Sequence, residues 1–251
     1  RKKEKFLKEM MIKEEEKIDQ VIEWLEMEEA IRPKLIMTYW DGTDSVGHIY
    51  GTDHEKIFDQ MVRQDQMLGL LFSRLTEIDA WDYVTLLLVS DHGMINVNKY
   101  ISLKDVLDSI EIDYILSSGP AVAHIFIDDK AQRDEALELL SKQDHIIAYT
   151  RENIPESFHM NHPTRTGDLI VTTEPPYMFN NNPKDGPKGM HGYDPDLREM
   201  HAIFGAVGAG VRNERIGPIH MTDVAPTIAK LLGIKSVNHM QGRAIDLSPK
   251  D

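Results

Sequence analysis

Apolar residues recur at helical spacing in two long segments of the chain. The first segment, residues 13–30, has charged residues on its other side and predicts an amphipathic helix that ends before Pro33. The second segment, residues 53–78, predicts another long helix. The apolar positions are Ile18, Val21, Ile22 and Leu25 in the first segment, and Ile57, Met61, Leu68, Leu71 and Leu75 in the second.

Two shorter apolar runs have the length of buried strands. Residues 35–40 form the first run, and the polar loop Asp41-Gly42-Thr43-Asp44 follows it. Residues 83–90, YVTLLLVS, form the second run and lead into Asp91-His92-Gly93. The nearly continuous apolar character of the second run is typical of a strand buried on both faces of a parallel sheet. Strand, helix and strand in this order predict a crossover unit with both polar endings at the carboxyl edge of the sheet.

The middle of the chain has a pattern of its own. Residues 112–173 contain a strand, a helix over 130–142 and two further strands, which predicts a small inserted α/β subdomain. The flanking segments, 1–111 and 174–251, then form the core domain, completed by a strand near 201–208 and a helix over 222–232 that stops at Gly233. We therefore expect an α/β fold with a mostly parallel central sheet.

The composition of the chain limits which partners it could bind and which residues could form a metal site. The formal net charge is −14, with 42 acidic against 28 basic residues, which argues against binding to duplex nucleic acid. The chain has no cysteine, so a metal site would use histidine and carboxylate ligands. It has no apolar run of about 20 residues, so we expect no transmembrane segment within it.

Three clusters of metal-ligand residue types each lie beside a predicted strand. They are Asp44 with His48, Asp91 with His92, and His191. Taken singly, each cluster also has a purely structural interpretation, as turn formers or as packed or surface residues. Together they supply two aspartates and three histidines, the mixture that Zn²⁺ prefers where thiolates are absent.

The stretches TDSVGHIYG, LLLVSDHGM, KGMHGYDPDLREMHAIFGAVGAGVR and TDVAPTIAKLLGI resemble the type I phosphodiesterase/nucleotide pyrophosphatase family of the alkaline phosphatase superfamily. The resemblance implies two zinc ions at the carboxyl edge of a mostly parallel sheet. Asp44, His48 and His191 match the ligands of one zinc, and Asp91 and His92 match ligands of the other. It also implies a small-molecule phosphoester substrate and an extracytoplasmic location, either periplasmic or secreted.

The sequence departs from the family pattern near its beginning. The family completes its second zinc site with an aspartate and a nucleophilic threonine or serine from motifs nearer the amino terminus. No segment before Asp44 has that pattern. We therefore expect the chain to correspond to the carboxyl-terminal two thirds of the catalytic domain, with an incomplete second zinc site and no turnover when alone.

Two other interpretations fit the same ligands. One is another hydrolase of the superfamily, of the phosphonoacetate hydrolase or phosphomonoesterase type. Sulfatases fit less well, because they need a cysteine or serine that is converted to formylglycine, and the chain has no cysteine. The other interpretation is a non-catalytic metal-binding paralogue.

Overall fold

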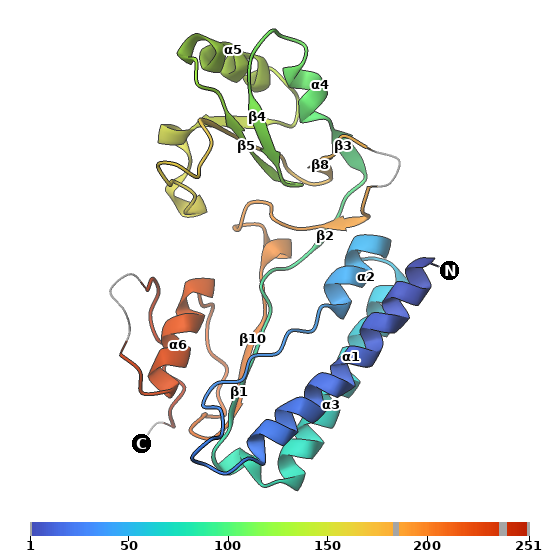
Figure 1. The fold of residues 1–251 in the computed structure, drawn as a ribbon, viewed down its shortest axis with the longest axis vertical. Coiled ribbons are helices and arrows are strands. Elements are labelled where there is room, and N and C mark those ends of the chain that lie inside the picture. Colours follow the sequence, from blue (N-terminus) through green and yellow to red (C-terminus); the bar gives the residue numbers. More distant parts are fainter. Residues whose placement is uncertain (1, 183–185, 236–239, 250–251) are drawn as a thin grey trace. The chain divides into compact units, whose positions relative to one another are not determined.

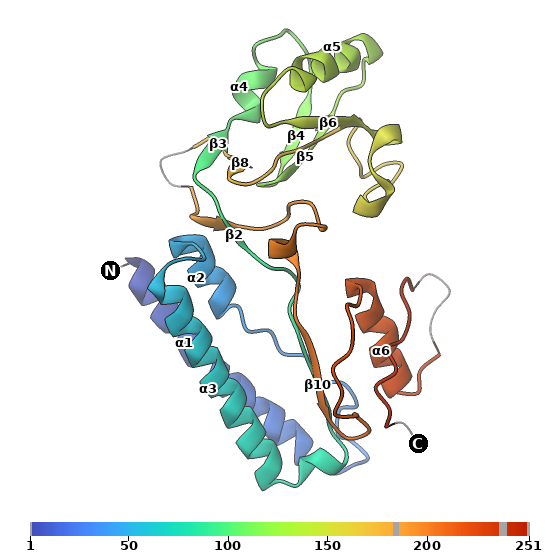
Figure 2. The same cartoon turned by 180° about the vertical axis from the view of Figure 1, so that it is seen from behind.

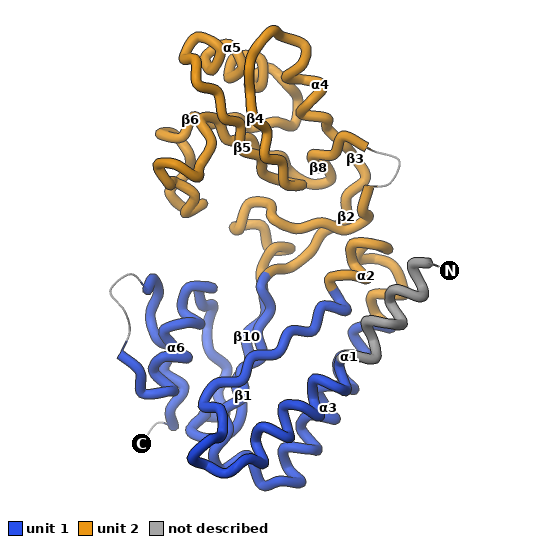
Figure 3. The backbone as a smooth tube through the Cα atoms, in the orientation of Figure 1, with its two compact units in different colours: residues 1–43, 59–91, 202–251 blue, residues 44–58, 92–201 orange. Residues whose placement is uncertain are grey.

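The computed structural model describes residues 2–182, 186–235 and 240–249, with side chains from residue 14 onward. The described chain forms two compact units (Figure 3). Unit 1 consists of residues 1–43, 59–91 and 202–251, and unit 2 of residues 44–58 and 92–201. The predicted insertion, residues 112–173, falls wholly within unit 2; its boundaries stay a prediction.

Helix α1 (Lys2–Leu25) lies in unit 1 and runs beside α3 (Glu55–Glu77), which belongs to unit 1 from residue 59 onward (Figures 1 and 2). Their contact buries apolar positions predicted from helical spacing, and Arg74 Nη2 lies 2.7 Å from Asp19 Oδ1. The buried residues of this cluster are Ile18, Ile22, Leu25, Met67, Leu71, Leu75 and Ala80.

Two details of these helices differ from the prediction. Helix α1 ends at Leu25 rather than near residue 30, because Glu28 and Glu29 occupy the positions three and four residues later, where the apolar side would continue. Met61 was predicted as core and is 56% exposed, whereas Gln60 is buried. Gln60, rather than Met61, therefore lies on the buried face of α3.

The sheet of unit 1 differs most from the prediction. Strand β1 (Thr85–Val89) forms where expected, but it pairs antiparallel with β10 (Phe204–Gly208), and Leu88 and Val89 are exposed. Residues 35–40 form no strand, and every second residue there, Leu35, Met37 and Tyr39, is exposed. For the described residues, the predicted parallel crossover is wrong, because β1 pairs there only with the antiparallel β10. The predicted burial of β1 on both faces is also wrong, because its last two residues are exposed.

The last helix of unit 1, α6 (Val224–Leu231), follows a 3₁₀ turn, η6 (Met221–Asp223). The Asp223 carboxylate accepts hydrogen bonds from the backbone nitrogens of His220, at 3.0 Å, and Arg243, at 2.7 Å. Gly233 has φ 66° and stops the helix as predicted, because this left-handed conformation suits glycine.

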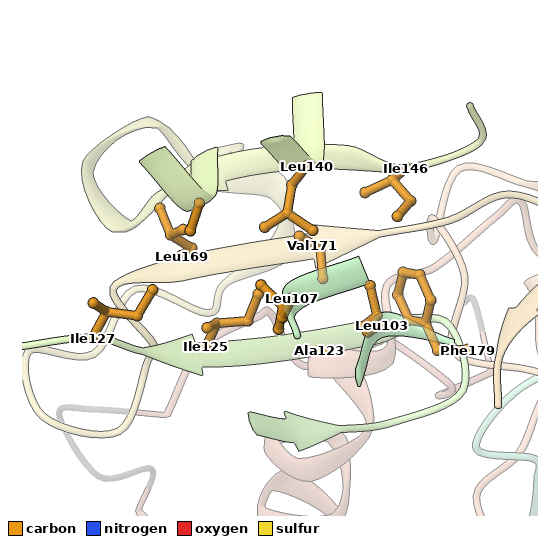
Figure 4. Packing of buried hydrophobic residues seen from close by; sticks show 11 residues of the cluster. Leu103, Leu107, Ala123, Ile125, Ile127, Leu140, Ile146, Leu169, Val171 and Phe179 are labelled. Carbon is orange, nitrogen blue, oxygen red and sulfur yellow. The ribbon is translucent and has the colours of Figure 1, made fainter. Parts of the chain in front are cut away.

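Unit 2 is built on a four-stranded antiparallel sheet in the order β4-β5-β7-β6. Helices α4 and α5 cover it, and their apolar residues form one core with β5 and β7 (Figure 4). The predicted helix over 130–142 and the predicted strands are confirmed. The bounds are α4 Leu103–Leu107, β4 Ile115–Ser118, β5 Val122–Phe126, α5 Lys130–Ser141, β6 Ile147–Thr150 and β7 Leu169–Thr172.

The rest of unit 2 consists of short elements. Helix α2 (Gly42–Tyr50) leads into this unit. Two strand pairs follow, antiparallel β2 with β9 and parallel β3 with β8. Their bounds are β2 Ile95–Asn96, β3 Lys99–Ile101, β8 Tyr177–Phe179 and β9 Gly189–Met190. The other short 3₁₀ helices described in the chain are Ala80–Asp82 (η1, unit 1), Arg151–Asn153 (η2), Glu156–Phe158 (η3) and Arg198–Met200 (η5).

Among the helices in the described part of the chain, none combines the length and apolar character needed to cross a membrane.

Candidate metal centre

Helix α2 brings Asp44 and His48 to one side of the chain. The sequence predicted a loop here, and that prediction is wrong: Asp44 lies in the first turn of α2 and His48 in its last. Residues four apart lie on the same helix face, and the structure places His48 Nε2 3.3 Å from Asp44 Oδ1. The spacing of the pair follows from the helix.

His191 reaches the same carboxylate from a distant part of the sequence. It directly follows β9, which is held by its antiparallel pairing with β2. His191 Nε2 lies 3.7 Å from Asp44 Oδ1. Gly192 has φ 85°, a left-handed conformation that lets the chain turn immediately after the histidine. The strand ending therefore fixes the place of His191.

His92 is the third imidazole beside Asp44. Its Nε2 lies 4.0 Å from Asp44 Oδ1, and its ring stacks on that of His191 with centroids 3.5 Å apart and an angle of 11°. The next residue, Gly93, donates its backbone N–H to Met200 O at 3.0 Å. A Cβ on Gly93 would collide with the Glu199 carbonyl oxygen, so glycine permits the close approach that holds His92 here.

Hydrogen bonds orient two of these rings. His48 Nδ1 lies 2.8 Å from the carbonyl oxygen of Gly189, and His92 Nδ1 lies 2.8 Å from that of Gly93. A carbonyl oxygen only accepts, so Nδ1 carries the hydrogen and Nε2 has the lone pair in the neutral ring. Both Nε2 atoms lie toward Asp44, the arrangement by which proteins prepare histidines for a metal.

The geometry of Asp44, His48 and His191 fits a zinc ion. One ligand atom from each of the three lies within 4.8 Å of the others, so the group could hold a metal. Asp44 Oδ1 is buried and accepts no hydrogen bond from the described residues. Two ligands about 2.0–2.1 Å from a tetrahedral zinc are about 3.3 Å apart, close to the 3.3 and 3.7 Å that separate Asp44 Oδ1 from the two Nε2 atoms. The side chains stay 26–30% exposed, which leaves one side open.

Asp91 has a different position in the fold. It is exposed and ends the segment 59–91 of unit 1, and the next residue, His92, belongs to unit 2. The predicted ligand roles of Asp91 and His92 at a second zinc stay predictions. His92 lies beside Asp44, which was predicted for the first zinc.

Tyr193 anchors the segment that carries His191, and sequence reasoning missed it. Its side chain is buried, and its hydroxyl donates to Tyr177 O at 2.7 Å. A tyrosine hydroxyl is protonated at neutral pH, and burial raises the pKa of Tyr193 further, so the hydroxyl remains a donor. In the sequence, Tyr193 is only an aromatic residue two positions after His191, and nothing there indicates that it holds this segment in place.

Comparisons with known proteins identify the family of the chain. The family model for type I phosphodiesterase / nucleotide pyrophosphatase matches residues 4–194. The chain is 31% identical over 230 residues to human ectonucleotide pyrophosphatase/phosphodiesterase family member 5, covering 90% of this chain and 47% of that protein. It is 29% identical over 200 residues to a Xenopus laevis bis(5'-adenosyl)-triphosphatase, covering 78% of this chain and 44% of that protein.

Solved structures show the same likeness. The human member 5 structure superposes with a TM-score of 0.82 at 29% identity, covering 91% of this chain and 61% of that one. An inactive murine member 5 in complex with AMP gives a TM-score of 0.81 at 29% identity, with the same coverage. The chain thus spans about half the length of the curated relatives it matches. The chain belongs to the type I phosphodiesterase/nucleotide pyrophosphatase family of the alkaline phosphatase superfamily.

Proposed function

We propose that Asp44, His48 and His191 hold a zinc ion in a protein that hydrolyses phosphodiester or pyrophosphate bonds. One observation carries the proposal: the buried Asp44 Oδ1 accepts no hydrogen bond from the described residues, while Nε2 of His48 lies 3.3 Å away and Nε2 of His191 lies 3.7 Å away. A buried carboxylate oxygen without a partner is costly, and a cation would compensate it.

We further propose that Asp91 and His92 belong to a second zinc site. The family resemblance supports this assignment. The aspartate that completes the site and the nucleophilic threonine or serine would come from a segment of the domain outside this chain, and so would further strands of a mostly parallel sheet. When bound, zinc supplies Lewis-acid stabilisation of the negative charge that develops on phosphoryl oxygens. The chain's own residues hold the metal and leave one side open to substrate.

A nucleotide or a related small molecule is the substrate class we propose. The names of relatives support it, since one is a bis(5'-adenosyl)-triphosphatase and another was solved in complex with AMP. Several relatives are named ectonucleotide enzymes, which supports an extracytoplasmic location for this protein. Residues 112–173 would form the inserted subdomain of the intact domain.

The proposal is tested with a version of this chain restored at its amino terminus with a segment that supplies the family's nucleophile and missing aspartate. We expect the restored protein to hydrolyse bis(p-nitrophenyl) phosphate and a dinucleoside polyphosphate with zinc, and Asp44→Asn to reduce the rate by at least about 100-fold. His54→Ala is the control, because His54 is exposed on the same unit and lies outside the cluster.

Three outcomes of this test would contradict parts of the proposal. Zinc binding with no hydrolysis of any phosphodiester would favour a non-catalytic metal-binding paralogue. Hydrolysis confined to phosphonates or phosphomonoesters would favour another hydrolase of the superfamily. Zinc-dependent turnover by the present chain alone would contradict the placement of the nucleophile outside it.

A further inference from the structure

We propose that a close contact between Gly47 of α2 and Gly189 of β9 sets the separation between His48 and His191. The inference rests on the proposed zinc site and assigns positioning residues to it. Gly47 directly precedes His48, and Gly189 comes two residues before His191. Any movement of one glycine from the other therefore moves a metal ligand.

The approach at Gly189 leaves no room for a side chain. A Cβ there would lie 2.5 Å from the carbonyl oxygen of Gly47 and 2.9 Å from Met94 Sδ. Cβ atoms in proteins essentially never come within 3.0 Å of another atom in this way, and a backbone carbonyl cannot rotate aside as a side chain can. Alanine at position 189 would therefore push β9 away from α2.

The approach at Gly47 is limited by a side chain instead. A Cβ on Gly47 would collide with Met94 Sδ, whereas Ile57 Cδ1 would lie at an ordinary 3.7 Å. Methionine is flexible, and removing it would free the space. Neither glycine is among those with positive φ, so alanine fits the backbone conformation at both sites and only the space is at issue.

Hydrogen bonds hold the two elements together at this contact. Lys188 N donates to His48 O at 2.8 Å, and His48 Nδ1 donates to Gly189 O at 2.8 Å. On its other side, β9 pairs with β2, with Gly189 opposite Asn96. Strand β9 is thus fixed between β2 and α2, and widening the gap would break the bond that orients His48.

Because the obstacle is a side chain at Gly47 and a backbone carbonyl at Gly189, adding Met94→Ala should restore metal binding to Gly47→Ala but not to Gly189→Ala. Gly189→Ala should weaken Co²⁺ and Zn²⁺ binding by roughly 10- to 100-fold, the range for groups that orient metal ligands. Met94→Ala should not rescue it, because the obstacle is the Gly47 backbone. Gly47→Ala should also weaken binding, and adding Met94→Ala should restore it to within about threefold of Met94→Ala alone.

The experiment titrates the full chain and its variants with Co²⁺ and Zn²⁺ and records the visible Co²⁺ bands at saturation. The bands report ligand geometry, which a change of stability alone would not shift. Gly69→Ala is the control, because Gly69 lies in helix α3 and a Cβ there meets nothing within 4 Å. Circular dichroism establishes that each variant is folded.

Each result has one interpretation. If the wild-type chain binds no metal at this cluster, the proposed zinc site fails. If the wild type binds metal and Gly47→Ala and Gly189→Ala match it in affinity and spectrum, the positioning role fails while the zinc site stands. If Gly189→Ala does not fold, the metal affinities of Gly47→Ala and Gly47→Ala/Met94→Ala still test the inference. If Met94→Ala does not restore the metal affinity of Gly47→Ala, the inference is overturned.

Discussion

His48 Nδ1 lies 2.8 Å from the carbonyl oxygen of Gly189, although the two residues are 141 positions apart in the sequence. The bond joins helix α2 to the strand ending that carries His191. It also fixes which nitrogen of His48 has its lone pair toward Asp44. Contacts within the fold therefore help to place the three candidate ligands.

Replacing His48 with alanine should lower the affinity of the chain for zinc by at least about 100-fold, because one of three candidate ligands is lost. Isothermal titration calorimetry measures the change. His54→Ala, which alters an exposed histidine six residues later, should leave the affinity unchanged. Equal losses in both variants would show that zinc binds to exposed histidines in general.

Two isoleucines in the sheet of unit 2 should contribute differently to the free energy of unfolding, because only one of them lies in the core. Ile125 on β5 is fully buried, and Ile147 on β6 is 50% exposed. Ile125→Ala should reduce the free energy of unfolding by about 2–5 kcal/mol. Ile147→Ala should reduce it by less than about 1 kcal/mol. Urea denaturation measures both, and comparable losses would contradict the described core.

Asp168 connects three parts of unit 2. Its Oδ1 lies 2.9 Å from Arg151 Nη2 and 3.4 Å from Arg133 Nη1, and its Oδ2 accepts from Ile127 N at 3.0 Å. Asp168→Asn should reduce the free energy of unfolding by about 1–3 kcal/mol, since a partly buried charged partner is lost. The exposed Asp134, which pairs with Lys130, is the control, and Asp134→Asn should change stability by less than about 0.5 kcal/mol.

His124 on β5 should make the stability of the protein fall in mild acid. Burial lowers the pKa of His124 below 6.5, and its Nδ1 accepts a hydrogen bond from Gly167 N at 3.2 Å. The unfolded chain therefore takes up this proton at a higher pH than the folded chain. The contribution of neutral His124 to the free energy of unfolding is fully present above pH 6.5. It is lost as the pH falls through the pKa that His124 has in the folded protein.

The control for this pH effect is His124→Gln, whose side-chain oxygen can still accept from Gly167 N. The thermal unfolding midpoint of the variant should depend less on pH between 7 and 5 than that of the wild type. A parallel pH profile for the two proteins would show that His124 does not contribute.

Elements with local signals were predicted well from the sequence. The spacing of Leu71 and Leu75 in α3 reflects one helix face, and Gly233 stops α6 by its own backbone conformation. The pairing of β1 was not predictable in the same way, because an apolar run does not say which strand lies beside it. The expected parallel neighbour, residues 35–40, is not a strand in the structure.

The candidate site shows the same division. The sequence indicated Asp44, His48, His92 and His191 by residue type and by their places beside predicted strands, although the loop predicted at Asp44 is the start of a helix. Nothing in the sequence indicated Gly47, Gly189 and Met94, because their importance depends on a close approach between segments far apart in the chain.

Anomalous scattering at the zinc edge, from crystals of the chain grown with Zn²⁺, tests the central claim most directly. The account predicts a peak about 2.0–2.2 Å from an Asp44 carboxylate oxygen, His48 Nε2 and His191 Nε2. Zinc bound only at other histidines, or no peak between these three side chains at saturating Zn²⁺, would contradict it.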